Sequence, residues 1–147
     1  MPFDDPRDFL EYLEERNDLL RISEEVDPKF GISAYIRKTS DQQGPALLFE
    51  NVKGHDTAVV GGIFASRRRV LMALGADPEN IYERFDHGVC NPIPTRLVET
   101  GPCKEVILKG DEVDLTRLPI PTYAEGDGGP FITHGIQISK DPETGTK

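Results

Sequence analysis

The sequence has few of the residues that build covalent or metal-based sites. It contains two cysteines and three histidines in 147 residues. Cys90 and Cys103 form no CxxC-like pair, so a disulfide framework is not expected and two free thiols are predicted. The histidines, His55, His87 and His134, show no metal-ligand spacing to one another or to the cysteines. The residues by themselves therefore assign no metal ligand.

Positive charge and long apolar runs are also scarce. Lysine and arginine number 17 against 26 aspartates and glutamates, which gives a formal net charge of -9. Without a basic stripe, the chain is not expected to bind nucleic acid. No apolar run approaches the roughly 18–20 residues that span a bilayer, so no membrane span is predicted. The opening "MPFDDPRDF" lacks the basic and apolar regions of a signal peptide, which favours a cytoplasmic location.

The sequence also lacks a recognisable catalytic set. No Ser-His-Asp or Cys-His arrangement emerges, and the acidic residues of the second half have no partner nucleophile, so they are interpreted as solvated charges: Glu105, Asp111, Glu112 and Asp114. His55 and His87 are expected in structural or solvent roles. His134 lies on the apolar face of a predicted strand and is expected to be a core residue with satisfied hydrogen bonds. No catalytic residue is assigned from these patterns.

The first half alternates predicted helices and strands. Three Asp-Pro pairs, at residues 5–6, 27–28 and 77–78, resemble an N-cap followed by proline at the first helical position. The first pair predicts a helix over Pro6 to Asn17 that buries Phe9, Leu10 and Leu13. The second predicts a helix over Pro28 to Thr39 that buries Ile32, Tyr35 and Ile36. The third predicts a helix that begins at Pro78 and buries Ile81 and Phe85. A further helix is expected from Ser66 to Leu74, ended by a left-handed Gly75. Strands are expected at Leu19 to Ile22, Ala46 to Val52 and Thr57 to Ala65, the last two joined by the "KGHD" turn. The fold class is α+β.

The second half, from about residue 91, is predicted to be rich in strands. Runs at Arg96 to Glu99, at Cys103 to Leu108 and at Phe131 to Ser139 suit strands. The last run places Ile132, His134, Ile136 and Ile138 on one face, and "KDPETGTK" then supplies Pro142 and Gly145 for a turn. A strand followed by a turn needs a returning partner for its backbone groups, so this half is expected to be unfinished.

Two glycine-containing stretches leave alternatives open. "GGIFASRRR", residues 61–69, could hold a phosphate at a helix N-terminus, but it matches neither of the common phosphate-binding fingerprints. Glycines that permit close packing, followed by a helix with an exposed basic face, are the favoured interpretation. "GDGGP", residues 126–130, must turn sharply or approach something closely. Another strand is favoured over a ligand as its neighbour.

Two long blocks carry a resemblance to a known family. "CKEVILKGDEVDLTRLPIPT" and "DGGPFITHGIQISKDPETG" resemble the UbiD family of decarboxylases. Upstream, "DFLEYLEERNDLLRI", "GPALLFENVKG" and "ALG" are also similar to the family's N-terminal region, so the resemblance covers almost the whole chain. It implies an N-terminal α/β domain over residues 1–95, followed over residues 96–147 by the first strands of a split β-barrel that binds the flavin.

The resemblance also implies a chemistry. UbiD-like enzymes are carboxy-lyases that reversibly decarboxylate aromatic or α,β-unsaturated carboxylic acids with prenylated FMN, and a divalent metal, typically manganese, bridges the cofactor phosphate to the protein. The cofactor carries the reaction while the protein supplies positioning and electrostatics. A homo-oligomer is expected, because the family's C-terminal domain helps form oligomers.

The family's catalytic residues have no counterparts in this sequence. In the family, an Asn-x-x-x-x-Arg segment follows "KDPETG" and holds the first metal ligand and the arginine of a Glu-Arg-Glu set; the similarity stops at Lys147. Thr133 alone is carried over, as a candidate cofactor neighbour, because it matches a threonine on the family strand that faces the flavin. The chain alone is expected to be inactive and to bind no cofactor. The alternative is a non-catalytic assembly module that pairs its open terminal strand with a partner chain.

Overall fold

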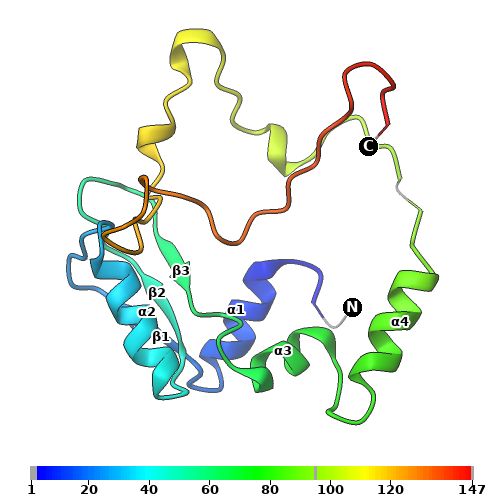
Figure 1. Ribbon diagram of the computed structural model, residues 1–147, viewed down its shortest axis with the longest axis horizontal. Coiled ribbons are helices and arrows are strands. Elements are labelled where there is room, and N and C mark those ends of the chain that lie inside the picture. Colours follow the sequence, from blue (N-terminus) through cyan, green and yellow to red (C-terminus); the bar gives the residue numbers. More distant parts are fainter. Residues whose placement is uncertain (1–2, 95, 147) are drawn as a thin grey trace.

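A small three-stranded sheet with helices on both faces forms the first half of the chain. The computed structural model describes residues 3–94 and 96–146. The helices are α1 (Pro6–Glu14), α2 (Gly31–Asp41), α3 (Arg67–Leu74) and α4 (Ile81–Cys90), and the strands are β1 (Leu19–Ile22), β2 (Ala46–Phe49) and β3 (Val59–Gly61). In Figure 1 the described residues beyond α4 make no sheet, and they arch away from the first half before returning along it.

The sheet has the order β1-β2-β3 and mixes two kinds of pairing. β1 pairs in parallel with β2, with Leu19 opposite Ala46, and α2 provides the crossover between them. β2 and β3 form an antiparallel hairpin in which Phe49 lies opposite Val59. The three strands predicted for the first half are therefore confirmed, although β2 and β3 are shorter than their predicted ranges.

Helix α1 begins where the sequence predicts. The Asp5 carboxylate accepts a hydrogen bond from the backbone N–H of Arg7 at 2.7 Å, and Asp8 reaches back to the N–H of Asp5, which forms a capping box. Phe9 and Leu13 are buried as expected, whereas Leu10 is only half-buried. The helix ends at Glu14, three residues short of the predicted end.

Helix α2 begins later than predicted, and the prediction that Asp27 caps it is wrong. Residues 28–30 pair instead with Thr122, and Phe30 takes the N-cap position with a left-handed φ of 69°. Asp27 stabilises the preceding turn by accepting the N–H of Lys29. Because the pairing involves a residue some ninety positions away, no local pattern could reveal it. Ile32 is buried as expected, whereas Tyr35 is 43% exposed and was wrongly predicted to be inward.

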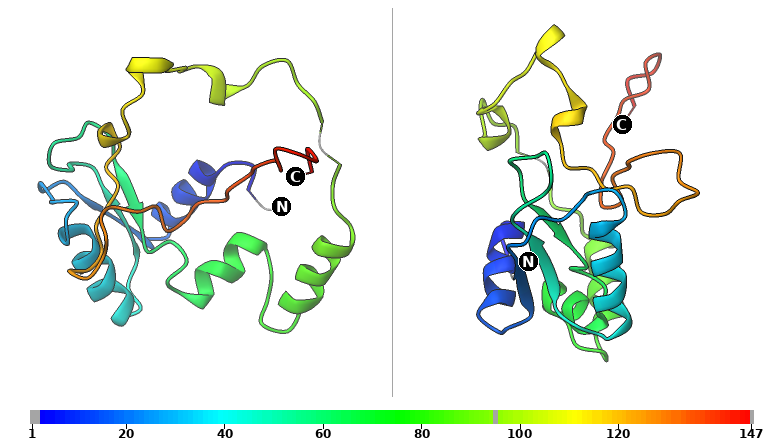
Figure 2. Two further views of the ribbon diagram at one scale, coloured as in Figure 1. Left: turned by 45° about the horizontal axis from the view of Figure 1, so that its top comes forward. Right: turned by 90° about the vertical axis from the view of Figure 1, so that its left-hand side faces the viewer.

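Two hydrophobic clusters lie on opposite faces of the sheet, which the right-hand view of Figure 2 shows between α1 and α2. On the α2 side the cluster consists of Ile22, Val26, Ile32, Leu47, Phe49 and Val52. On the α1 side it consists of Phe9, Leu13, Leu19 and Ala46, with residues of α3 packed against it. Alternate residues of β2 enter different clusters, as the two-residue period of a strand requires.

The last two helices differ in how well they pack. Helix α3 follows Ser66 and ends at Gly75, whose φ of 57° confirms the predicted left-handed residue. Helix α4 begins three residues after Pro78 and buries no residue; Phe85 is 67% exposed, so its predicted burial is wrong. The cause is visible in Figure 1, where α4 lies apart from the sheet. None of the helices in the described parts of the chain is long and apolar enough to cross a membrane.

The strands predicted for the second half do not form among described residues 96–146. Their place is taken by extended chain and three single turns of 3-10 helix: Pro102–Lys104, Gly110–Glu112 and Leu115–Arg117. The three isoleucines of the predicted apolar face, Ile132, Ile136 and Ile138, are 65%, 93% and 81% exposed. No neighbouring strand is available among the described residues, and a single strand cannot satisfy its own backbone groups. The barrel strands remain an expectation from the resemblance.

The turn near the C-terminal end does form. Asp141 accepts backbone hydrogen bonds from Glu143 and Thr144 at 2.9 and 2.6 Å, and its own N–H donates to the carbonyl of Thr146. Gly145 has the left-handed φ of 69° that the sequence predicted for it. The predicted turn over these residues is confirmed.

Candidate functional site

A segment of the second half is anchored on the beginning of α2, and this contact forms the candidate site. Thr122 makes two backbone hydrogen bonds there: its carbonyl accepts the N–H of Phe30 at 3.0 Å, and its N–H donates to the carbonyl of Pro28 at 3.2 Å. Pro119 and Pro121, just before it, are buried. The "LPIPTY" stretch of the sequence therefore attaches the second half of the chain to the first half.

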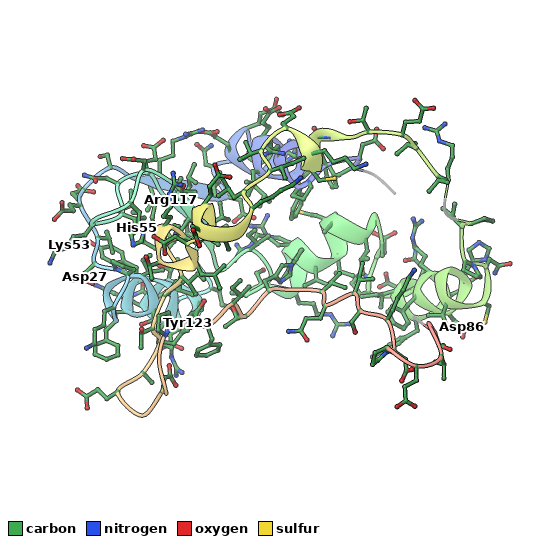
Figure 3. All side chains as sticks on the ribbon, turned by 90° about the horizontal axis from the view of Figure 1, so that it is seen from above. Asp27, Lys53, His55, Asp86, Arg117 and Tyr123 are labelled. Atoms are coloured by element: carbon green, nitrogen blue, oxygen red, sulfur yellow. The ribbon has the colours of Figure 1, made fainter. Side chains whose placement is uncertain are left out.

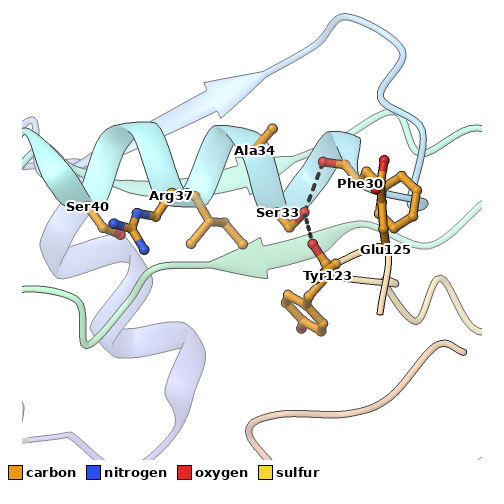
Figure 4. A pocket seen from close by; sticks show the side chains of 9 residues that line it. Phe30, Ser33, Ala34, Arg37, Ser40, Tyr123 and Glu125 are labelled. Carbon is orange, nitrogen blue, oxygen red and sulfur yellow. Dashed lines mark hydrogen bonds between the residues drawn. The ribbon is translucent and has the colours of Figure 1, made fainter. Parts of the chain in front are cut away.

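The hydroxyl of Ser33, in the first turn of α2, strengthens this attachment. Its Oγ lies 2.9 Å from the carbonyl of Phe30 and 3.0 Å from the carbonyl of Tyr123, as Figure 4 shows. A hydroxyl has one proton, which is donated to either carbonyl or shared between them. The backbone of Tyr123 is thereby tied to α2 in the first half of the chain.

The glycine-rich loop that follows is shaped by one carboxylate. Asp127 accepts hydrogen bonds from the backbone N–H groups of Tyr123 and Ala124 at 3.1 and 2.8 Å. An added Cβ at Gly126 or Gly128 would meet no atom within 4 Å, so the predicted close packing against a strand is wrong. Gly129 instead supplies a φ of 148°, which a residue with a side chain would adopt only with strain.

After the loop, the chain returns to Tyr123. The rings of Tyr123 and Phe131 lie 4.9 Å apart between centroids, and the Tyr123 hydroxyl lies 3.2 Å from Oγ1 of Thr133. The Thr133 side chain is exposed on an irregular segment. The structure thus joins the candidate cofactor neighbour to a residue that the sequence patterns did not single out.

Two open pockets flank the anchored segment. One, of about 670 Å³, is the pocket of Figure 4; it lies beside α2 and includes Ser33, Arg37 and Tyr123 in its wall. The other, of about 730 Å³, is bordered by the glycine-rich loop and His55. Both volumes are within the range of small-molecule sites. The guanidinium of Arg37 is ion-paired with Asp41 at 2.8 Å, and the first pocket offers a ligand hydroxyls, aromatic rings and the charged side chains of Arg37 and Glu125.

The electrostatics at the beginning of α2 are set by Asp27. Its carboxylate accepts the backbone N–H of Lys29 at 2.8 Å and lies 3.3 Å from the Lys53 ammonium. The Lys29 N–H, and then the Lys53 ammonium, hold the pKa of the Asp27 carboxyl below its usual value. Asp27 is therefore ionised at neutral pH and keeps this turn closed.

The histidines are dispersed and do not gather into a metal site. Figure 3 shows His55 beside Arg117, whose carbonyl lies 3.2 Å from the imidazole Nδ1. His87 contacts Asn91 at the end of α4. His134 is exposed and lies against the Phe64 ring at 5.5 Å, so its predicted place in the core is wrong. Within residues 3–94 and 96–146, no three His, Cys, Asp or Glu side chains are grouped closely enough to hold a metal.

The other sequence predictions on reactive groups are confirmed. Cys90 and Cys103 are exposed free thiols. The four acidic residues interpreted as solvated charges, at positions 105, 111, 112 and 114, are all exposed. Asp114 additionally caps the 3-10 turn Leu115–Arg117, and the hydroxyl and backbone N–H of Thr116 lower the pKa of its carboxyl.

The "GGIFASRRR" stretch is structural, as the favoured interpretation had it, with one correction. Gly61 permits close packing, because an added Cβ would overlap the side chain of Ile36. Arg69, however, is buried rather than part of an exposed basic face, and it donates to the Asp18 carboxylate at 3.0 Å. Sequence reasoning missed this pair, although Arg69 shares a helix face with Met72 and Ala73, which pack toward the α1 side of the sheet.

Two family models match successive parts of the chain. The model described as the "3-octaprenyl-4-hydroxybenzoate carboxy-lyase N-terminal domain" matches residues 10–87. The model described as the "3-octaprenyl-4-hydroxybenzoate carboxy-lyase Rift-related domain" matches residues 96–147. The first match alone covers more than half of the chain, and both domains belong to the same enzyme class.

Solved structures of this class are similar to the chain. An evolved dimeric form of the UbiD-class enzyme HmfF from Pelotomaculum thermopropionicum, in complex with prFMN, is 39% identical with a TM-score of 0.86, over 95% of this chain and 33% of that one. The open form of vanillic acid decarboxylase from Sedimentibacter hydroxybenzoicus is 33% identical with a TM-score of 0.73, over 87% and 29%. Apo 3,4-dihydroxybenzoic acid decarboxylase from Enterobacter cloacae is 29% identical with a TM-score of 0.85, over 99% and 33%. The chain spans about a third of the length of these structures.

Proposed function

This chain belongs to the UbiD family, and from that premise we propose that it forms the N-terminal α/β domain (1–95) and the first part of the flavin-binding split β-barrel (96–147) of a decarboxylase. The reaction is the reversible decarboxylation of an aromatic or α,β-unsaturated carboxylic acid with prenylated FMN. The observation that carries the proposal is the order of the two family matches, residues 10–87 and then 96–147, along one chain. It is supported by the similarity to a UbiD-class enzyme in complex with prFMN.

Within this function, the role of the described residues is positioning. Prenylated FMN, when bound, supplies the electron-accepting ring system on which loss of carbon dioxide depends. Thr133 is exposed, which fits a side chain offered to that cofactor, and its hydroxyl lies 3.2 Å from that of Tyr123. The anchored segment Pro119 to Tyr123 fixes where residue 133 lies relative to α2.

The catalytic Glu-Arg-Glu set and the ligands of the divalent metal, manganese in the family pattern, are assigned to other parts of a UbiD-class chain. The side chains of residues 3–94 and 96–146 do not fit a metal, since they form no cluster of three ligating groups. No step of the reaction is therefore attributed to a metal held by them. A homo-oligomer is part of the proposal, in keeping with the dimeric form of the similar HmfF structure.

The proposal is tested by exchanging domains. Residues 1–147 replace the matching third of HmfF, and prFMN retained by the purified chimera is measured by absorbance. We expect the chimera to retain prFMN and residues 1–147 alone to release no carbon dioxide. Turnover of an aromatic acid by residues 1–147 alone would contradict the proposal that the catalytic residues lie in other parts of a UbiD-class chain. A folded chimera that retains no flavin would contradict the cofactor assignment.

A second candidate function is favoured by the exposed segment 131–139. Its isoleucines face solvent, and residues 132–140 make no backbone–backbone hydrogen bond to described residues. A non-catalytic assembly module could use such a segment to add a strand to a partner sheet. The native intact mass, compared with the length of the reading frame, separates the two functions. A frame that continues with Asn-x-x-x-x-Arg supports the enzyme, whereas a stop codon supports the module.

A further inference from the structure

The geometry points to Tyr123 as a positioning residue that holds the Thr133 hydroxyl in place relative to α2. The inference rests on the proposed function, in which Thr133 contacts the flavin. Tyr123 would not touch the cofactor itself; it would act through Thr133. Its hydroxyl lies 3.2 Å from Oγ1 of Thr133, and its backbone lies at the anchored segment.

Tyr123 is itself held on two sides. Its carbonyl lies 3.0 Å from the Ser33 hydroxyl of α2, and its N–H donates to the Asp127 carboxylate at 3.1 Å. The preceding residue, Thr122, is fixed by two backbone hydrogen bonds to the start of α2. The backbone from which the phenol projects is thus a fixed reference point on the first domain.

The segment carrying Thr133 makes few other contacts with the first half, apart from the His134 ring, which lies 5.5 Å from the Phe64 ring. Phe131 donates its N–H to the carbonyl of Pro121 at 3.2 Å, and its ring contacts Tyr123. Beyond Phe131 the described chain is exposed and irregular as far as the turn at Asp141. The contacts described for residues 131–133 therefore run through Pro121 and Tyr123, and among the described residues the hydrogen bond to the Thr133 side chain comes from Tyr123.

The ring and the hydroxyl of Tyr123 have separate roles. The ring packs against Phe131 and orders the backbone, whereas the hydroxyl selects one rotamer of Thr133, because a hydrogen bond to Oγ1 is made in one staggered position of χ1. Removing the hydroxyl while keeping the ring should free χ1 without detaching the segment. Tyr123→Phe is the variant that makes this distinction.

The experiment has two arms. In the 147-residue chain, the χ1 populations of Thr133 are measured by NMR scalar couplings for wild type and Tyr123→Phe. In the holoenzyme that carries this chain, the dissociation constant for prenylated FMN is measured for the same pair. We expect χ1 averaging in the variant, unchanged α2 amide shifts, and flavin binding weakened about twofold to tenfold, the range for one exchanged hydrogen bond.

Tyr82→Phe is the matched control, because Tyr82 lies on α4 and is 80% exposed. It should change neither readout. If Thr133 χ1 is unaltered in Tyr123→Phe while the wild-type holoenzyme binds flavin, the inference is overturned and the proposed function stands. If the wild-type holoenzyme binds no flavin, both are overturned. A change in the NMR chemical shifts of the α2 amides in Tyr123→Phe also overturns the inference, because Tyr123 would then be needed for the structure of the first half itself.

Discussion

At the residue scale, Arg69 shows how a charged side chain can become part of a core. Its guanidinium is 1% exposed, and it donates to the carbonyls of Ile63, Gly44 and Gly62 at 2.8, 2.9 and 3.1 Å in addition to Asp18. Four hydrogen bonds offset the large cost of removing the charge from water. One side chain thereby joins α3 to the residues just before β2 and just after β3.

Replacing Arg69 should therefore cost much more stability than replacing its neighbour. Arg69→Ala leaves three carbonyls and the nearly buried Asp18 carboxylate without this donor, so the free energy of unfolding should fall by about 3–5 kcal/mol. Arg67→Ala is the control: Arg67 is exposed on the same helix, and its loss should change stability by less than about 0.5 kcal/mol.

Urea unfolding followed by far-ultraviolet circular dichroism measures both variants. Arg68 also lies 2.6 Å from Asp18, and it can compensate for part of the lost charge in Arg69→Ala. The three carbonyls bonded by Arg69 would still lose their donor, because the Arg68 side chain is 57% exposed and pairs with Asp18. Equal unfolding midpoints for Arg69→Ala and Arg67→Ala would contradict the structural role given to Arg69.

At the scale of elements, the success of sequence reasoning depended on whether the deciding contact is local. The start of α1 was predictable because Asp5 and Asp8 complete a capping box within four residues, and the end of α3 because Gly75 is left-handed. The start of α2 was not, because residues 28–30 pair with Thr122, far along the chain. The site depended on such contacts too: Thr133 came from resemblance, but Tyr123 was found only when the structure brought the two together.

The turn at Asp141 is a local element with a predictable response to pH. Backbone and hydroxyl hydrogen bonds from Thr144, followed by the N–H of Glu143, lower the pKa of the Asp141 carboxyl. Because the folded pKa is depressed, the turn's stabilisation is fully present above the ordinary aspartate value of about 3.9 and is lost as the pH falls through the folded pKa.

An NMR titration of the Asp141 carboxyl carbon and the Thr144 amide measures this response. Both should titrate together, with a midpoint below that of aspartate in a short peptide. In Asp141→Asn the amide keeps an acceptor oxygen without the titrating charge, so the Thr144 shift should lose its acid transition. A midpoint at or above the peptide value would contradict the hydrogen bonds assigned to this turn.

At the scale of the whole molecule, the two halves differ in how they meet the demands of the backbone. In the first half, the sheet and two hydrophobic clusters bury part of the apolar set that the sequence patterns selected, namely Phe9, Leu13 and Ile32. In the second half, the same kind of alternating pattern from Phe131 to Ser139 meets no partner strand and stays exposed. Strand periodicity reports which face would be buried, but it does not supply the neighbour that makes a strand.

Amide hydrogen exchange should reproduce this division. In residues 1–147 alone, amides of β2 should exchange slowly because the strand is paired on both sides, by β1 and β3. Amides 132–139 should exchange at rates close to those of an unstructured peptide, since they have no backbone acceptor among the described residues. In the HmfF chimera, the proposed barrel would supply neighbouring strands, so the same amides should become protected while β2 changes little. Protection of amides 132–139 in residues 1–147 alone would mean that this strand forms without neighbouring barrel strands. Fast exchange of the same amides in a flavin-binding chimera would mean that this segment is not part of the proposed barrel.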